Sequence, residues 1–321
     1  MKILITGGGG FLGFRLARTL AARGQLGGRA ISSITLLDGA FPPAAGQDKR
    51  FTLVQGDVSD AQTLARVCPP DTDAVFHLAA VVSGAAEADF DLGMCVNLKG
   101  TELLLAQMRK CAQPPRLVYT SSVAAFGGAL PSVLDDTTIA NPQTSYGTQK
   151  VIGEYLVSDY TRKGFLDGRS LRLPTIVVRA GKPNAAASSF ASGILREPLN
   201  GEMSECPVAP ETGVWMLSPG RCVEAFIHAW ELAPEAWGTQ RWLNLPGITA
   251  TVAQMIEALK KVAGPKAAGR VVFKPDARIQ AIVKTWPAAF RTPRALAMGF
   301  QADADVESII RAYVADEGIS L

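Results

Sequence analysis

The chain has 321 residues, 48% hydrophobic and 19% charged, which is the balance of a globular protein and excludes a disordered chain. Its 32 basic and 29 acidic residues give a formal net charge of +3 without a polybasic run, so we predict a small-molecule ligand and no nucleic-acid partner. No apolar run approaches the roughly 18 residues that cross a bilayer, and the five cysteines form no C-x-x-C pair, so we expect a cytoplasmic protein with reduced thiols and no membrane partner.

A predicted first strand, Lys2 to Thr6, runs directly into the glycine-rich segment Gly7 to Gly13, which opens a helical pattern that continues to Arg23. Two glycine spacings overlap there, G-x-G-x-x-G starting at Gly8 and G-x-x-G-x-x-G starting at Gly7. In either spacing the glycines permit a tight turn and a close approach to a pyrophosphate, whose charge the free N–H groups of the helix start would bind. The residues predicted to contact a dinucleotide here are Gly7, Gly10, Phe11, Leu12 and Gly13.

Acidic residues follow the next two predicted strands, Ser33 to Leu37 and Thr52 to Gln55. Asp38 stands where a carboxylate accepts hydrogen bonds from the adenosine ribose, and it favours NAD because it would repel the 2′-phosphate of NADP. Asp57 and Val58 follow the third strand, where such a pair commonly contacts the adenine. An aspartate after a glycine is also ordinary turn chemistry, and both interpretations of Asp57 stay open.

The fourth and fifth predicted strands are Ala74 to Leu78 and Arg116 to Thr120, and the fifth runs into Ser121-Ser122 at the carboxyl end of the sheet, where open α/β sheets bind ligands. In the following helical pattern, Tyr146 and Lys150 are four residues apart and share one face. A tyrosine has a pKa of about 10, so it becomes a base near neutral pH only if a nearby cation favours the phenolate. We predict Tyr146 as a general base with Lys150 beside it, although this spacing alone is also typical of a surface helix.

The sixth predicted strand, Ser170 to Val178, is followed by a segment rich in Gly, Pro, Ser, Asn and Ala, and there the alternation of strands and helices stops. That alternation predicts an α/β fold, a Rossmann-type doubly wound parallel sheet with a smaller C-terminal substrate lobe. We expect residues 1–178 to form the NAD-binding domain with the catalytic residues, and residues 179–321 to form mainly the substrate-binding lobe, with some segments returning to the core. Further helical patterns occur at Arg221 to Glu231, Val252 to Val262 and Val306 to Asp316.

Over residues 1 to about 180 the chain resembles the extended short-chain dehydrogenase/reductases, the NAD-dependent epimerase/dehydratase family. The matching motifs are Thr6-Gly7-Gly8-Gly9-Gly10-Phe11-Leu12-Gly13, His77-Leu78-Ala79-Ala80, Val96-Asn97 with Gly100-Thr101, and Ser121-Ser122-Val123-Ala124-Ala125-Phe126-Gly127. Phe126 departs from the family pattern, which has a tyrosine there, and this puts in doubt any role borrowed from that tyrosine.

The resemblance implies that Ser122 is the catalytic serine, that Lys150 also binds the nicotinamide ribose and that the protein is a homodimer. It further implies that Leu78, Ala79 and Ala80 contact NAD. For Asn97 it implies a proton path through water, while a purely structural amide remains an equal alternative.

Within the family, the segment Leu171 to Asn184 differs from the nucleotide-sugar enzymes and is similar to the D-erythronate dehydrogenases. This implies oxidation of the C2 hydroxyl of a four-carbon sugar acid, with Tyr146 removing the hydroxyl proton while NAD accepts the hydride. Binding the substrate carboxylate requires cations or hydrogen-bond donors. Besides Ser122 and Tyr146, the candidate substrate ligands are Arg179, Lys182, Asn184, Ser188 and Arg196.

Two other functions stay open. A nucleotide-sugar 4-epimerase or dehydratase would keep NAD bound and release no NADH. A sensor that merely binds NAD is disfavoured, because it would not need a serine, a tyrosine and a lysine together. His77 and His228 have no other metal-ligating residues near them in the sequence, so we predict no metal.

Overall fold

The computed structural model describes residues 1–181 and 187–321 and divides into two compact units. Unit 1 comprises Met1–Ser122, Thr144–Arg172 and Val223–Leu243. Unit 2 comprises Val123–Gln143, Leu173–Cys222 and Asn244–Leu321. Both units are therefore assembled from segments that are distant in the sequence. The assignment of residues 179–321 as a mainly substrate-binding lobe stays a prediction.

Unit 1 is built on a seven-stranded sheet with the order β12-β8-β7-β6-β1-β4-β5. The strands are β1 (Lys2–Thr6), β4 (Ser33–Asp38), β5 (Phe51–Gln55), β6 (Ala74–His77), β7 (Arg116–Ser122), β8 (Asp167–Leu173) and β12 (Trp242–Asn244). The pairs β1/β4, β4/β5, β1/β6 and β6/β7 run parallel. The order of the strands in the chain reverses at β1, which confirms the predicted Rossmann-type doubly wound sheet. In such sheets ligands generally bind at the carboxyl ends of the strands beside the reversal, which here are β1 and β6.

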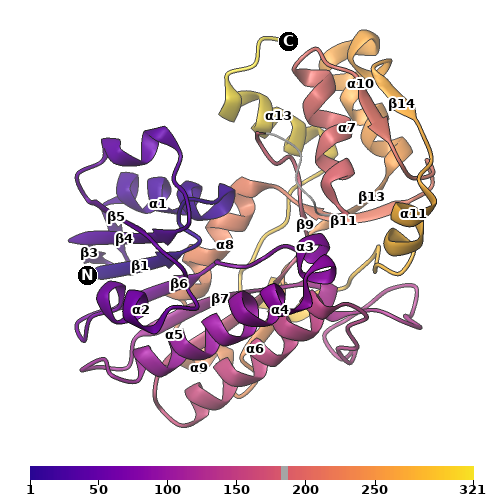
Figure 1. The fold of residues 1–321 in the computed structure, drawn as a ribbon. Helices are drawn as coiled ribbons and strands as arrows, with labels where there is room; N and C mark the ends of the chain where they lie inside the picture. Colours follow the sequence, from indigo (N-terminus) through magenta and orange to yellow (C-terminus); the bar gives the residue numbers. More distant parts are fainter. Residues whose placement is uncertain (182–186) are drawn as a thin grey trace. The chain divides into compact units, whose positions relative to one another are not determined.

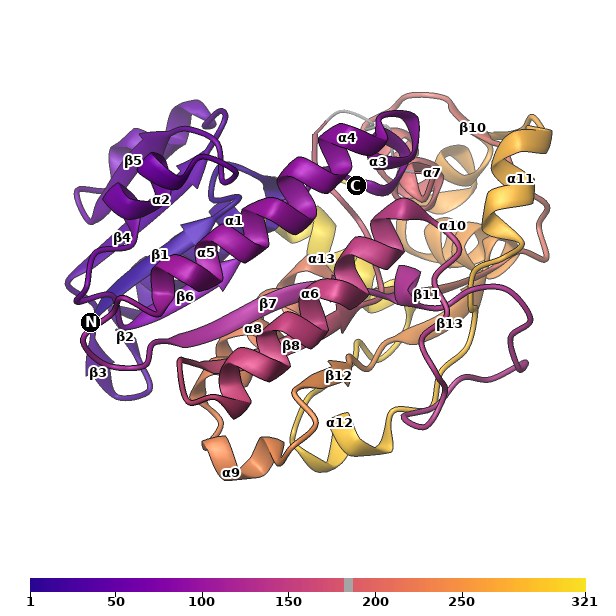
Figure 2. The ribbon, with the colours of Figure 1, turned by 60° about the horizontal axis from the view of Figure 1, so that its bottom comes forward.

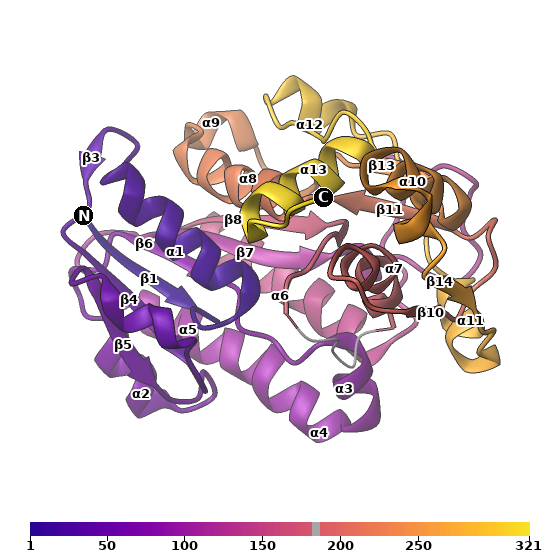
Figure 3. The same cartoon turned by 90° about the horizontal axis from the view of Figure 1, so that it is seen from above.

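Helices cover both faces of this sheet (Figures 2 and 3). On one face lie α2 (Ala61–Val67), α5 (Gly100–Met108) and α6 (Ser145–Arg162), side by side. On the other lie α1 (Phe11–Arg23) and, from Val223 onward, α8 (Pro219–Glu231). Strands covered on both faces bury nearly every residue, as the apolar run of β6 does. The shorter elements of unit 1 are β2 (Gln25–Leu26), β3 (Arg29–Ala30), η1 (Pro43–Gln47), α3 (Ser83–Ala88), α4 (Phe90–Gly93), η2 (Met94–Lys99) and α9 (Pro234–Trp237).

Unit 2 has its own hydrophobic core, which includes Ile194, Met255 and Ile310. Its sheets have the orders β13-β11-β9 and β10-β14. The elements are η3 (Val123–Ala125), β9 (Thr175–Ile176), α7 (Ser189–Leu199), β10 (Ser204–Cys206), β11 (Gly213–Leu217), β13 (Ile248–Thr251), α10 (Val252–Ala268), β14 (Val271–Phe273), α11 (Ala277–Val283), α12 (Pro293–Ala297) and α13 (Val306–Glu317). The three core residues lie on α7, α10 and α13, and α10 packs against both of the other helices (Figure 1). Asp305 caps α13 by accepting a hydrogen bond from the Ser308 N–H, so the last predicted helix is confirmed.

The prediction of a single strand over Ser170 to Val178 is wrong. Strand β8 ends at Leu173, and β9 pairs with β11 in a different sheet. Pro174 separates the two strands, because proline has no N–H to donate to a sheet and restricts the residue before it. The sequence-based interpretation also missed β12, whose three residues are too few for a clear strand pattern.

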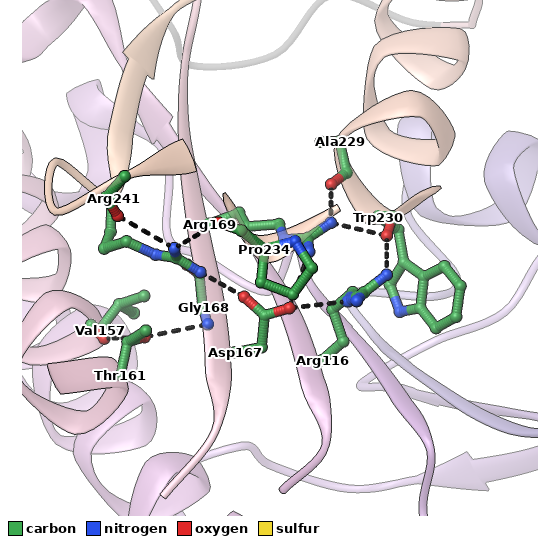
Figure 4. A network of polar contacts seen from close by, with 11 residues as sticks. Arg116, Val157, Thr161, Asp167, Gly168, Arg169, Ala229, Trp230, Pro234 and Arg241 are labelled. Atoms are coloured by element: carbon green, nitrogen blue, oxygen red, sulfur yellow. Dashed lines mark hydrogen bonds and ion pairs between the residues drawn. The ribbon is translucent and has the colours of Figure 1, made fainter. Parts of the chain in front are cut away.

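Asp167, at the start of β8, is surrounded by three arginines (Figure 4). Its Oδ2 accepts hydrogen bonds from Arg116 Nε at 2.9 Å and from an Arg169 terminal nitrogen at 2.7 Å, and its Oδ1 accepts one from Arg241. Arg116 and Arg169 also donate to the Trp230 carbonyl, at 2.5 and 2.6 Å, near the end of α8. The network therefore satisfies a carbonyl group at the helix C-terminus and ties α8 to β7 and β8.

In the described part of the chain, no helix combines the length and the apolar character needed to cross a membrane.

Candidate active site

The glycine loop makes a turn that excludes side chains. Gly7 has φ of +72°, and a Cβ on it would lie 2.7 Å from the Ala79 nitrogen. A Cβ on Gly13 would lie 2.0 Å from the Gly7 carbonyl oxygen. Helix α1 then begins at Phe11, and no side chain among the described residues caps it. Its first N–H groups are therefore available to an anion, so this cradle fits a pyrophosphate.

Asp38 lies beside this loop. Its Oδ2 accepts hydrogen bonds from Gly9 N at 3.0 Å and Gly10 N at 3.1 Å, and its Oδ1 receives only a long contact of 3.4 Å from Ala40 N. The carboxylate therefore has acceptor capacity left for hydroxyl groups, as an adenosine ribose requires. The structure fits the prediction that this half of the site takes NAD.

The residues after β6 also lie against the loop. The Leu78 N–H donates to the Thr6 carbonyl at 3.0 Å, and the Ala79 N–H lies 3.4 Å from the Thr6 hydroxyl. Ala79 is the residue that leaves no room for a Cβ on Gly7. The predicted contacts Leu78 and Ala79, with Ala80 next in the chain, are therefore brought beside the predicted pyrophosphate cradle.

Asp57 and Val58 occupy a turn after β5. Asp57 Oδ1 accepts hydrogen bonds from the N–H and the hydroxyl of Ser59, both at 2.8 Å. Val58 is buried, and a Cβ on Gly100 would lie 2.7 Å from its Cγ1. Both residues thus have a structural role in the turn and in seating α5, and their contact with adenine stays a prediction.

Ser122, Tyr146 and Lys150 are brought together by β7 and α6. The Ser122 hydroxyl is hydrogen-bonded to Tyr146. The Lys150 ammonium donates to the Thr120 carbonyl at 2.8 Å and lies 5.6 Å from the centre of the Tyr146 ring. Burial raises the pKa of Tyr146 to about 12, opposed by the bond from Ser122. Burial lowers the pKa of Lys150 to about 7, opposed by the charge of Glu154.

Asn97 lies in η2, a π-helical turn between α4 and α5, and such turns are frequent at functional sites. Its Oδ1 accepts from Val81 N at 2.7 Å, and its Nδ2 donates to Val81 O at 3.1 Å and to Gln149 Oε1 at 2.8 Å. Both amide hydrogens are thus committed to protein groups. The arrangement ties the loop after Ala80 to α6, and a proton path through Asn97 stays a prediction.

Glu154 and Arg172 are buried charged residues next to the triad that the sequence-based interpretation missed. Glu154 is 1% exposed and Arg172 5%. The guanidinium donates to both carboxylate oxygens, at 2.8 and 2.6 Å, and the Ser121 hydroxyl donates to Oε1. A signal was present, because Glu154 repeats the four-residue spacing of Tyr146 and Lys150.

The described candidates Arg179, Ser188 and Arg196 belong to unit 2. Arg196 is buried, and it donates to the Arg179 carbonyl at 2.8 Å and to Glu197 Oε1 at 2.6 Å. Arg179 is partly exposed, and within the described residues no carboxylate pairs with its guanidinium. Ser188 precedes α7 as its N-terminal cap residue. Lys182 and Asn184 lie outside the described residues. Of the described candidates, Arg179 is therefore the cation with capacity left for a carboxylate.

Among the residues that the structure describes, no three His, Cys, Asp or Glu side chains gather as the ligands of a metal ion would.

Comparisons with known proteins bear on this site. The model of the NAD dependent epimerase/dehydratase family matches residues 3–234. The chain is 56% identical to a D-erythronate dehydrogenase from Cupriavidus necator, with 100% of both chains covered. It is 43% identical to a D-erythronate dehydrogenase from Haemophilus influenzae, over 98% of this chain and 99% of that protein. Among solved structures, a nucleoside-diphosphate-sugar epimerase from Agrobacterium tumefaciens is 43% identical, with a TM-score of 0.93 over 100% of this chain and 95% of that chain.

Proposed function

The chain belongs to the NAD-dependent epimerase/dehydratase family, as its motifs predict, and we propose that it is an NAD-dependent dehydrogenase that oxidises the C2 hydroxyl of D-erythronate to the 2-oxo acid. The observation that carries the proposal is the 56% identity to a D-erythronate dehydrogenase along the whole of both chains. A second relative named for the same activity, 43% identical, supports it.

The cofactor is proposed to lie along the glycine loop. Gly7, Gly10 and Gly13, with the N–H groups of Phe11 and Leu12, hold the pyrophosphate, and Asp38 accepts hydrogen bonds from the adenosine ribose. Three further groups complete the proposed cofactor site: Asp57 with Val58 at the adenine, Leu78 to Ala80 beside the loop, and Lys150 at the nicotinamide ribose. When bound, NAD supplies the acceptor for hydride and a positive charge near Tyr146.

Tyr146 is proposed as the general base for the C2 hydroxyl. The phenolic oxygen takes the hydroxyl proton, while the Ser122 hydroxyl holds the same substrate oxygen in place. Because burial raises the pKa of Tyr146, the phenol needs a nearby cation to release its own proton near neutral pH. Lys150 supplies that cation from the same face of α6.

A sugar acid also brings a carboxylate. We propose that Arg179 binds it, because its guanidinium has no carboxylate partner among the described residues and charge-assisted pairs of this kind are strong. Lys182, Asn184 and Ser188 are proposed to add polar contacts. Arg196 is proposed to support Arg179 through its bond to the Arg179 carbonyl. Asn97 is proposed to hold the loop after Ala80 and to contribute to proton transfer.

The similarity to a nucleoside-diphosphate-sugar epimerase, 43% identical, favours one alternative. In that alternative the same residues serve an epimerase or dehydratase that keeps NAD bound. The two functions differ in one observable, since only the dehydrogenase releases NADH in proportion to substrate.

The test is to mix the purified protein with NAD and a panel of D-erythronate, L-threonate, related aldonic acids and UDP-glucose, and to follow the absorbance of NADH. We expect turnover with D-erythronate that Tyr146→Phe lowers by about 1,000-fold. If no acid produces NADH and UDP-glucose is converted, the epimerase proposal replaces this one.

The assembly is a further part of the proposal. We propose a homodimer, because the family resemblance implies one, and we keep the sequence-based expectation that the protein works in the cytoplasm. Light scattering of the purified chain measures the mass in solution, and a monomer at assay concentration would contradict the dimer.

A further inference from the structure

Tyr146, Lys150 and Glu154 lie on successive turns of α6, each four residues after the last, so they share one face of the helix. Lys150 and Glu154 are almost completely buried, at 2% and 1% exposed. Only Tyr146 and Lys150 have roles in the proposed reaction. The Glu154 carboxylate therefore needs a separate explanation, because burying a charge is costly unless it is paired.

Lys150 is surrounded by groups from four elements. On α6 these are Tyr146 and Glu154. On β7 the Tyr119 ring lies 5.0 Å from the ammonium, and the Thr120 carbonyl accepts its hydrogen bond. On β6 the imidazole of His77 is uncharged near neutral pH, since burial, reinforced by the charge of Lys150, lowers its pKa to about 3. On β8 the relevant charged group is Arg172, which pairs with Glu154. Of these groups, Glu154 is the one that carries a negative charge.

Arg172 is the partner of the Glu154 carboxylate. Burying a carboxylate is costly unless it is paired. Here both of its oxygens accept hydrogen bonds from the guanidinium, at 2.8 and 2.6 Å, in the strong two-bond geometry of arginine and carboxylate, and Oε1 also accepts one from Ser121. The carboxylate is thereby paired and fixed one helical turn from Lys150.

We propose that Glu154, held by Arg172, is a positioning residue that keeps Lys150 protonated beside Tyr146. The argument rests on the proposed roles of Tyr146 and Lys150. Burial removes water from the ammonium and favours its neutral form, and a carboxylate one turn away offsets that effect. Glu154 thus acts on the reaction through Lys150, without touching the substrate.

The direction of the effect follows from charge. In Glu154→Gln the ammonium loses its anionic neighbour, and the Arg172 charge that Glu154 had neutralised remains, so Lys150 releases its proton at a lower pH. In Glu154→Gln/Arg172→Met both charges are gone, so the midpoint should lie between those of Glu154→Gln and the unmodified protein. Glu154→Asp retains the carboxylate and should titrate close to the unmodified protein.

The test titrates Lys150 directly in the full-length, cofactor-free protein. Lysine side chains are labelled with ¹³C at Cε, the Lys150 signal is assigned by its absence in Lys150→Arg, and its midpoint is followed by NMR. We expect a midpoint near 7 that falls by about one pH unit or more in Glu154→Gln. Equal midpoints in the unmodified protein, in the double variant and in folded Glu154→Gln would overturn the proposal.

The double variant keeps the test usable if Glu154→Gln does not fold. It removes the Glu154 and Arg172 charges together, so neither of these two is left buried without the other. If Glu154→Gln is unfolded, the Lys150 midpoint of the double variant is compared with that of Glu154→Asp. A lower midpoint in the double variant supports the proposal, and equal midpoints contradict it.

The kinetic readout is the pH dependence of kcat with D-erythronate, whose alkaline limb should move to lower pH in the same order of variants. A purely structural role would lower kcat without moving that limb. If D-erythronate gives no NADH at all, the proposed function fails, but the titration of Lys150 still tests the role of Glu154.

Discussion

The Thr6 hydroxyl lies 2.6 Å from Nδ1 of His77, across the ends of the neighbouring strands β1 and β6. On the other side of the imidazole, Nε2 lies 2.9 Å from the Thr101 hydroxyl, which donates its own hydrogen to the Asn97 carbonyl at 2.7 Å. Nε2 must therefore carry the imidazole proton, and Nδ1 accepts from Thr6. A second proton on the ring would break this arrangement.

This relationship predicts that the fold loses stability in mild acid. Burial lowers the pKa of His77 to about 3, against an ordinary value of about 6.5 in the unfolded chain. Between about pH 6.5 and about pH 3 the unfolded state binds a proton on His77 that the folded state does not bind. The free energy of unfolding therefore falls as pH decreases from about 6.5 towards 3, by up to about 1.4 kcal/mol per pH unit. Urea unfolding at several pH values measures the slope. It should be shallower in His77→Gln, and identical slopes would contradict the prediction.

Tyr146→Phe should lower kcat on D-erythronate by about 1,000-fold, because general-base catalysis contributes on the order of 100- to 10,000-fold. The loss should occur without a change in melting temperature large enough to indicate unfolding. Tyr155→Phe is the matched control on the same helix, since Tyr155 is 61% exposed and its ring contacts Trp242. If Tyr146→Phe and Tyr155→Phe had comparable activities, Tyr146 would not be the general base.

Gly13→Ala should abolish the stabilisation of the protein by NAD. Alanine ordinarily stabilises a helix by about 1 kcal/mol over glycine, but here its Cβ would lie 2.0 Å from the Gly7 carbonyl oxygen, and the loop must distort. The measurement is the rise in melting temperature on adding NAD. Gly46→Ala is the control, because a Cβ there meets no atom within 4 Å. An unaltered response in Gly13→Ala would show that the loop is not the cofactor site.

Asp38→Asn should weaken NAD binding by about tenfold, as expected when a hydrogen bond to a charged acceptor becomes neutral. It should also reduce the preference for NAD over NADP, because the repulsion of the 2′-phosphate is removed. Calorimetric titration of both cofactors gives the two affinities. If the ratio of the NAD and NADP affinities were unchanged in Asp38→Asn, Asp38 would not be the source of the cofactor preference.

Asp167→Asn should destabilise unit 1 by about 3 kcal/mol, because it leaves three guanidinium groups, one of them fully buried, without their carboxylate. Burial already lowers the pKa of Arg169 to about 10. Asp71→Asn is the control, since its ion pair with Lys2 is exposed and should contribute less than about 1 kcal/mol. Urea unfolding compares the two losses, which should differ clearly.

The sequence predicts those parts of the molecule whose signal is local. Parallel strands such as Ala74–His77 appear as nearly continuous apolar runs, and Tyr146 and Lys150 are recognised by their four-residue spacing on a helix. The sequence did not predict the buried pair of Glu154 and Arg172, because charged residues usually face water and only the folded sheet brings these two together. The π-helical turn around Asn97 has no sequence pattern of its own.

The division of the chain has a consequence for biosynthesis. The edge strand β12 and most of α8 belong to unit 1, yet they follow a long stretch of unit 2 in the chain. A nascent chain that has emerged only as far as residue 178 lacks both, and β8 then stands as an unpaired edge, open to pairing with other chains. Unit 1 is thus completed late during synthesis on the ribosome, and a fragment cut at residue 178 should aggregate where the full-length chain folds.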